Sequence, residues 1–139
     1  MTHSEFERWL QDLYGARLSN DVDRCMPFFT AHSTFQLAGS GNASSIARAS
    51  DSLAAIRDHV TELVRTWSWK KMEIYNRVID GDTAAVRYQL TAVFNPSGEL
   101  ITTEIVDVVK VSERKVVEFH QFVDTAEIER IVARARAAK

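Results

Sequence analysis

Three polar residues fall at positions where the sequence predicts an apolar interior, and they are the candidates for chemistry. Asp107 stands in the run Thr103, Ile105, Asp107, Val109 and Val111, which alternates as a half-buried strand does. A carboxyl buried among apolar side chains without a cation has a raised pKa, and groups shifted in this way gather at functional sites. We therefore expect a neutral Asp107 that donates a hydrogen bond to a ligand. A structural Asp107, satisfied by a backbone amide or a hydroxyl group, fits the same pattern.

Tyr14 and Gln121 are the other two candidate catalytic residues. Tyr14 borders the apolar stripe of an N-terminal helix, so its hydroxyl group either enters an enclosed space or remains in water. Gln121 faces the same interior if the last strand contains a bulge near the Glu113–Arg114 turn. In that register its amide would hold a ligand or a water molecule, or would pair with Asp107 or Asn76.

Long strands joined by tight turns would position these side chains. The stretch Met72–Asp124 alternates as strands do, and turn sequences interrupt it at Gly81–Asp82, Asn95–Gly98 and Ser112–Lys115. A sheet of this kind needs a cover for one face, and the preceding helices supply it. The residues expected on the helix-facing side are Met72, Ile74, Val78, Ala84, Val86, Tyr88, Leu90, Ala92, Val117, Phe119 and Val123.

The turn between the second and third of these strands predicts their register. It sets Ile105 opposite Tyr88 and Asp107 opposite Val86. Arg87 then points to the other face, so no Lys, Arg or His is expected beside Asp107 on the paired strands.

Helical patterns flank the predicted sheet. A Ser4–Glu7 capping box begins a first helix over about residues 4–18, and Ser19–Asp21 caps a short second helix that Pro27 makes irregular. A short strand follows at Ser33–Leu37.

Two further helices and one loop complete the chain. Ser50 or Asp51 would cap a third helix, and Asp124 with Glu127 would cap a terminal helix that runs to about Ala137. The loop at Gly39–Ser45 lacks the third glycine of the G-x-G-x-x-G pattern, so we expect no phosphate site there. The apolar stripe of the third helix is Leu53, Ile56, Val60, Leu63, Val64 and Trp67.

The composition opposes several classes of function. We expect one domain over residues 1–139. The net charge of −2 opposes a nucleic-acid partner, and no stretch approaches the ~18 apolar residues of a membrane span. Because Cys25 is alone and the N-terminus lacks a leader pattern, we expect a cytoplasmic location. No metal and no cofactor are expected, since ligand spacing is absent among His3, His32, His59 and His120.

The order of the elements and two short motifs resemble a known family. Helix, helix, strand, helix and a four-strand meander, with the hairpin Val78–Val86 and the closing Phe122–Thr125, resemble the SnoaL-like group of the nuclear transport factor two-like superfamily. The resemblance covers nearly the whole chain. It implies an α+β fold, a cystatin-like cone in which three N-terminal helices pack on a curved, mostly antiparallel sheet, followed by a C-terminal helix. It also implies a homodimer through the outer face of the sheet, where Val93, Val106, Val108 and Phe122 are expected.

The resemblance extends to part of a catalytic site. Tyr14 resembles the oxyanion-hole tyrosine of ketosteroid isomerase, and Asp107 resembles both its protonated aspartic acid and the acid of limonene epoxide hydrolase. The isomerase's general base would fall near Leu37, the epoxide hydrolase's arginine at Ile105, and the last-strand acid of polyketide cyclases at Gln121. The donor half of such a site is present, and the general base of these relatives is not found.

Two hypotheses follow from the residues and the resemblance. In the first, the protein is an isomerase, cyclase or dehydratase of a small, largely apolar carbonyl compound, and Tyr14 and neutral Asp107 donate hydrogen bonds to a developing oxyanion. In the second, it is a dimeric protein that binds an apolar ligand without turning it over, as the missing base favours. In both, the expected ligand contacts are Phe28, Phe35, Leu37, Val60, Trp67, Tyr88, Phe119 and Val123.

Overall fold

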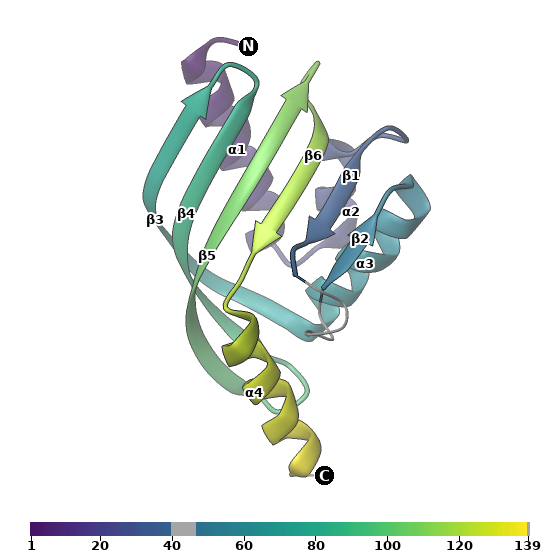
Figure 1. Cartoon of the computed structure of the whole chain (residues 1–139), viewed down its shortest axis with the longest axis vertical. Coiled ribbons are helices and arrows are strands. Elements are labelled where there is room, and N and C mark those ends of the chain that lie inside the picture. The colour runs from purple at the N-terminus through teal and green to yellow at the C-terminus, as the bar shows by residue number, and fades with distance from the viewer. Residues whose placement is uncertain (40–46, 139) are drawn as a thin grey trace.

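A curved six-stranded sheet is the frame of the fold (Figure 1). The computed structural model describes residues 1–39 and 47–138, so most of the predicted Gly39–Ser45 loop lies outside the described residues. β1 and β6 pair in parallel, and the other neighbouring strands pair antiparallel. The strand order is β2 (Arg48–Ser50), β1 (Thr34–Leu37), β6 (Lys115–Phe122), β5 (Glu99–Ser112), β4 (Thr83–Phe94) and β3 (Trp67–Asp80).

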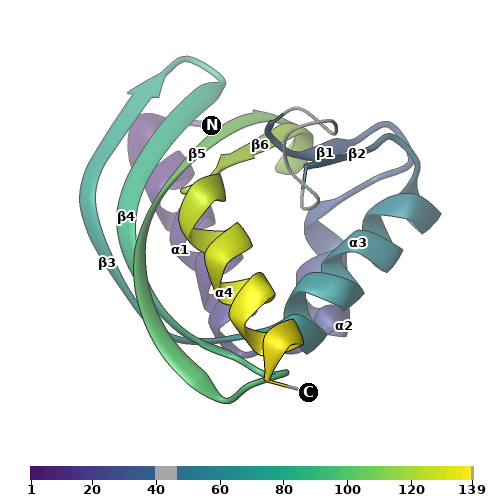
Figure 2. The ribbon, with the colours of Figure 1, turned by 60° about the horizontal axis from the view of Figure 1, so that its bottom comes forward.

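The helices fill and close the concave side of this sheet. Figure 2 shows the sheet bending around α1, with α3 on the far side of the opening and α4 lying across it. This arrangement confirms the predicted α+β cone. No helix within the described residues is long and apolar enough to cross a membrane. The helices are α1 (His3–Leu18), α2 (Val22–Cys25), the 3₁₀ turn η1 (Met26–Phe28), α3 (Leu53–Thr66) and α4 (Thr125–Ala137).

The predicted register of the central hairpin is confirmed. Tyr88 pairs with Ile105, and Val86 pairs with Asp107. Alternation therefore turns every second residue of β4 and β5 toward the helices. These inward residues form the middle of the core together with α1, and on β4 they are Ala84, Val86, Tyr88, Leu90 and Ala92, all buried.

Bulges decide which residues of the outer strands face inward. In β6, Val111 pairs with Val116 whereas Lys110 pairs with Glu118, so Val117 is an extra residue. The predicted bulge is thus present and turns Gln121 inward, but Val116 takes the core position expected for Val117.

A bulge in β3 overturns one expectation. The pairing shifts between Ile74 and Asn76, so the strand reverses its faces there. Val78, expected on the helix-facing side, is consequently 63% exposed, and Ile79 packs on the core instead.

Two predicted helix caps are wrong, and two are confirmed, one of them Asp21 on α2, which accepts from the Asp23 amide. Thr2 caps α1 by accepting from the Glu5 amide, so the helix begins before Ser4. Ser52 caps α3, because Arg48–Ser50 form the short strand β2 and the chain turns into the helix only after this strand ends. Asp124 caps α4 as predicted, accepting from the Glu127 amide at 3.1 Å.

The boundary between α3 and β3 also differs from the expectation. The predicted stripe of the third helix continues to Trp67, but α3 ends at Thr66 and β3 begins at Trp67, ahead of Met72. Leu53, at the other end of the predicted stripe, is 41% exposed. The indoles of Trp67 and Trp69 therefore project from the sheet and line the interior space beneath it.

Candidate functional site

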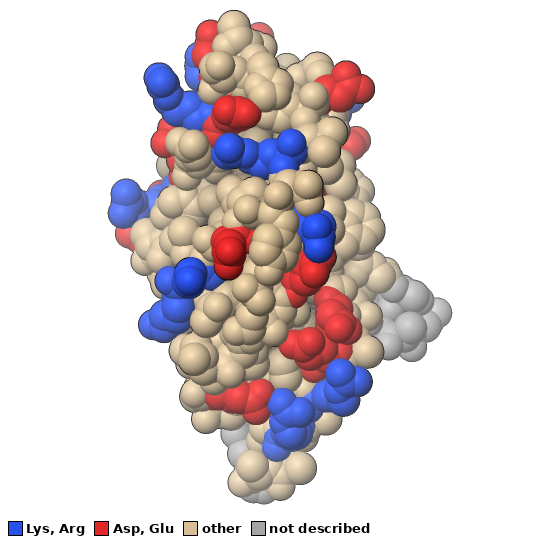
Figure 3. Space-filling view, turned by 90° about the vertical axis from the view of Figure 1, so that its left-hand side faces the viewer, with Lys and Arg blue, Asp and Glu red and all other residues tan. Residues whose placement is uncertain are grey.

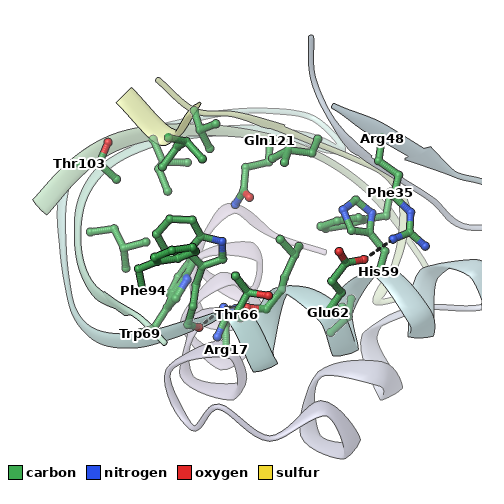
Figure 4. Close-up of a pocket in the computed structure, with 18 of the residues that line it drawn as sticks. Arg17, Phe35, Arg48, His59, Glu62, Thr66, Trp69, Phe94, Thr103 and Gln121 are labelled. Atoms are coloured by element: carbon green, nitrogen blue, oxygen red, sulfur yellow. Dashed lines mark hydrogen bonds and ion pairs between the residues drawn. The ribbon is translucent and has the colours of Figure 1, made fainter. Parts of the chain in front are cut away.

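The cone encloses a cavity of about 660 Å³ between its helices and the concave face of the sheet. Its walls are mainly apolar and come from α1, α3, α4 and the strands (Figure 4). Aromatic side chains gather at two places, Trp67 with Phe94 at ring centroids 4.6 Å apart and Phe35 with Phe119 at 5.2 Å. Such a space suits a small apolar molecule.

Asp107 is the centre of a buried hydrogen-bond cluster on one wall of the cavity. The Tyr14 hydroxyl donates to Asp107 Oδ2 at 2.6 Å, and the Tyr88 hydroxyl donates to the same oxygen at 2.8 Å. The Gln121 amide nitrogen lies 3.4 Å from the Tyr88 hydroxyl oxygen, which it donates to. Four elements, α1, β4, β5 and β6, thus meet at one carboxyl group.

The second oxygen of this carboxyl has no partner. Among the described residues, the buried side-chain atoms without a hydrogen bond are Asp107 Oδ1 and Thr103 Oγ1, and both residues line the cavity. A buried polar atom without a partner costs about 1–3 kcal/mol. Both atoms have almost no accessible surface, and their residues border the cavity.

Burial shifts the acid–base chemistry of the cluster. It raises the pKa of the Asp107 carboxyl to about 6, although the hydrogen bonds from Tyr14 and Tyr88 and the nearby Gln121 amide lower it in part. The raised pKa agrees with the expectation. At a pKa of about 6, however, the ionised form of Asp107 still predominates at pH 7. Burial and the nearby Asp107 raise the pKa of both tyrosines well above 10, so both hydroxyls remain donors.

The structure brings most of the site residues predicted from the sequence together around the cavity. Tyr14, Asp107 and Gln121 line the cavity, and Figure 4 shows the Gln121 amide pointing into it from the sheet. Two expected ligand contacts lie elsewhere: Phe28 packs on Trp9 at 5.6 Å, and Tyr88 is fully buried behind the wall with its hydroxyl on Asp107. The other expected contacts line the cavity, namely Phe35, Leu37, Val60, Trp67, Phe119 and Val123.

Sequence reasoning missed Arg17, a cation in the cavity wall. Its guanidinium donates to the backbone oxygens of Leu63 and Trp67 and to Asn20 Oδ1, and it lies 4.6 Å from the Trp69 ring centroid. Burial lowers its pKa to about 10, so it stays charged. The available signal was its place in the apolar stripe of the first helix, three residues after Tyr14.

His59 was missed as well. It is 3% exposed on α3 and lines the cavity, and its Nδ1 lies 3.4 Å from Ser50 Oγ. Burial and the charge of Arg48 lower its pKa to about 4. The available signal was the spacing of His59 three residues after Ile56, within the stripe of the third helix.

The charged residues Arg48 and Glu62 beside the cavity form an ion pair and not a metal site. Both line the cavity and form a salt bridge of 2.8 Å (Figure 4). Within the described residues, no group of three or more His, Cys, Asp or Glu is placed to hold a metal ion.

Comparisons with known proteins agree on one family and one fold. The SnoaL-like domain family matches residues 7–119 of this chain. No protein with a curated function matches it.

Similar solved structures carry several named activities at low sequence identity. A candidate isomerase from Rhodopseudomonas palustris is 12% identical with a TM-score of 0.78, over 96% of this chain and 99% of that one. A candidate SnoaL-like polyketide cyclase from Jannaschia sp. CCS1 is 14% identical with a TM-score of 0.72, over 88% and 87%. An LEH-like epoxide hydrolase from M. tuberculosis is 11% identical with a TM-score of 0.69, over 94% and 91%. At these identities the likeness concerns the fold.

The raised pKa of Asp107 predicts a specific pH dependence of stability. The folded pKa of about 6 exceeds the ordinary 3.8, so the folded state binds this proton more tightly than the unfolded state. The stabilisation is present below about pH 4 and is lost as the pH rises through about 6, by about 3 kcal/mol. In Asp107→Asn this loss of stability should be absent. Urea unfolding of the variant and the wild type at pH 4 and pH 7 measures the difference in their free energies of unfolding.

The control is Asp12→Asn, which removes an exposed carboxyl from α1. Its stability should follow the wild-type pH dependence. If Asp107→Asn and the wild type change in parallel between pH 4 and pH 7, the raised pKa is wrong.

Proposed function

This chain belongs to the SnoaL-like domain family, and we propose that its cavity binds a small, largely apolar carbonyl compound and isomerises, cyclises or dehydrates it. Tyr14, Asp107 and Gln121 form the polar part of this site. The proposal involves no cofactor.

The observation that carries the proposal is Asp107 Oδ1, a buried oxygen that has no hydrogen-bond partner within the described residues. Tyr14 and Tyr88 both donate to Oδ2, so a proton on the carboxyl belongs on Oδ1. A neutral Asp107 then donates a hydrogen bond from Oδ1, and a carbonyl oxygen is a suitable acceptor. Negative charge that develops on this oxygen during reaction strengthens the bond, which is the basis of oxyanion stabilisation.

Tyr14 and Tyr88 have supporting roles in this arrangement. Because their hydroxyl groups are already used on Oδ2, they hold the carboxyl in place and keep its proton on the other oxygen. A carbonyl ligand favours the neutral carboxyl further, since it accepts a hydrogen bond only from that form. Binding would therefore raise the pKa of Asp107 above its value of about 6.

The cavity's size and walls define the ligand class. Its volume of about 660 Å³ lies in the ordinary range for small-molecule sites, about 300–1,000 Å³. The aromatic pairs Trp67–Phe94 and Phe35–Phe119 suit a flat or cyclic apolar body. The second candidate function, binding without turnover, is favoured by the apolar Leu37 at the position where the isomerase relatives carry a carboxylate base.

The neutral-donor role predicts that ketone affinity depends on pH. For 4-phenylcyclohexanone, followed through the fluorescence of Trp67 and Trp69, we expect affinity to fall about tenfold from pH 5 to pH 8 as Asp107 ionises. Asp107→Asn should bind with nearly wild-type affinity at pH 5 and show no pH dependence, because the amide always donates. Phenylcyclohexane, which has no carbonyl, is the matched ligand control and should bind independently of pH. A wild-type ketone affinity that is constant over this range contradicts the proposal.

The second part of the proposal is a homodimer through the outer face of the sheet. This face carries exposed Tyr75, Val78 and Phe122, with Val106 and Val108 half-buried between them. Apolar residues grouped on one face commonly mark an interface. Figure 3 shows that the surface at the β3 side mixes both signs of charge, so no field of one sign opposes association there.

The dimer is tested by sedimentation velocity at micromolar concentration. We expect a dimer for the wild type and a monomer for Val78→Lys, since a charge buried among the apolar residues of an interface is costly. Leu53→Lys, which changes a comparably exposed apolar residue on α3, is the control and should remain dimeric. A wild-type monomer rejects this part of the proposal without affecting the carbonyl site.

A further inference from the structure

The cavity has a second polar group that the proposed carbonyl site does not use. His59 is buried on α3, its ring meets Phe35 edge-on at 4.9 Å, and its Nδ1 faces Ser50 Oγ. Its Nε2 makes no hydrogen bond within the described residues and is not among the fully buried atoms without a partner, so it keeps some accessible surface. A buried imidazole with one nitrogen held and the other available has the arrangement of a proton acceptor.

Strand pairing places Phe35, the β1 residue that His59 contacts, two strands away from Asp107 in the sheet. Asp107 on β5 pairs with Gln121 on β6, and Gln121 pairs with Leu37 on β1. β1 is therefore two strands away from β5, or roughly 10 Å. His59 packs on Phe35, which is in the same strand as Leu37 and on the same face, and Figure 4 shows the two polar groups His59 and Gln121 on different walls.

We propose that His59 is the general base of this protein, and that it removes a proton from a carbon of the substrate whose carbonyl oxygen is held by Asp107. The inference rests on the proposed carbonyl site and adds the base that the resemblance to known enzymes leaves missing. Ser50 is a positioning residue, because it acts on the imidazole and does not line the cavity.

The proton transfer balances without a further reactant. With Nδ1–H donating to Ser50 Oγ, Nε2 has the free electron pair and takes the proton as the carbon–hydrogen bond breaks. The electrons of that bond form a carbon–carbon double bond, and the carbonyl π electrons move to oxygen, where the Asp107 hydroxyl stabilises the enolate. The imidazolium then returns the proton to a different carbon, which completes an isomerisation.

The surroundings of His59 define how strong a base it is. Ser50 and Arg48 face it from β2, Glu62 from α3 and Phe35 from β1. Burial and Arg48 lower its pKa to about 4, and Glu62, which is paired with Arg48, opposes this only in part. His59 is thus neutral throughout the physiological range but weakly basic. A weak base removes only acidic protons, so the substrate class is a ketone whose reacting carbon also adjoins a double bond or a second carbonyl.

The pH dependence of the reaction follows from both groups. Activity requires neutral His59, which is the main form above about pH 4, and neutral Asp107, which is the main form below about pH 6. The rate should therefore rise through about pH 4 and fall through about pH 6, with the upper limit moving to higher pH when the ketone is bound.

Deuterium exchange tests the proposal with one probe. In 4-phenylcyclohex-3-en-1-one the carbon between the carbonyl and the double bond has acidic protons, and proton NMR in D₂O follows their loss. We expect the wild type to accelerate exchange over buffer with the bell-shaped profile above. His59→Gln should bind the probe within about threefold of the wild type but lose about 100-fold or more of the exchange rate.

Two further variants separate catalysis from structure. His32→Gln changes an exposed histidine outside the cavity and should exchange at the wild-type rate. Ser50→Ala should lower the rate while binding is kept, and it should shift the acidic limit of the profile, which a merely structural role would not do.

Each outcome decides a different claim. Exchange by His59→Gln at the wild-type rate overturns His59 as the base. Tight, pH-dependent binding of the probe with no exchange at any pH from 4 to 8 also overturns it, while the carbonyl site stands and the protein is a binder. Failure of the probe to bind at all rejects the carbonyl site, and the base falls with it.

Discussion

One carboxyl oxygen joins the first helix to the sheet. Asp107 Oδ2 accepts from Tyr14 on α1 and from Tyr88 on β4, and the two rings lie edge to face at 5.5 Å. A carboxyl buried in an apolar core is tolerated only with such donors. The position of α1 in turn places Arg17, whose hydrogen bonds reach the end of α3 and the start of β3. The cluster at Asp107 therefore sets the arrangement of the surrounding elements as well as the chemistry of the cavity.

The hydrogen-bond cluster at Asp107 lies between a filled core and an open cavity. On the α1 side of the cluster, Phe6 and Leu10 pack against the sheet with almost no exposed surface. On the other side, α3 contacts the sheet through His59 and Phe35, α4 contacts it through Arg134 and Glu99, and residues of both helices line the cavity. Solved structures at 11–14% identity share the fold, so the fold does not depend on the identity of particular wall residues. The chemistry is then a matter of a few polar positions.

The sequence was sufficient for the central hairpin because local rules determine it. The Asn95–Gly98 turn and strict alternation gave the pairing of Asp107 with Val86, and with it the inward carboxyl. Alternation gives the face of a residue but not the atoms that meet, so Tyr88 was expected as a ligand contact and proved to be a partner of Asp107.

Other features depended on choices that local sequence leaves open. Ser50, Asp51 and Ser52 are all acceptable helix caps, and only the three-residue strand β2 selects the last of them. Trp67 fits both the helical stripe that precedes it and the strand that follows. The bulge in β3 has no sequence signal that we can identify, and the meeting of His59 with Ser50 depends on how α3 packs beside β2.

The extra residue Val117 in β6 has a consequence for both faces of the sheet. Beyond this bulge the strand shows Phe119 and Gln121 to the cavity and His120 and Phe122 to the outside. If regular pairing continued from Val111–Val116 and Val117 were paired instead of bulged, the two sets would exchange faces, because strand faces alternate with a period of two. The His120 imidazole would replace the Gln121 amide beside Asp107, and the apolar Phe122 would turn from the outer face of the sheet to the inner face. The bulge at Val117 thus determines the inner chemistry and the outer surface of this strand together.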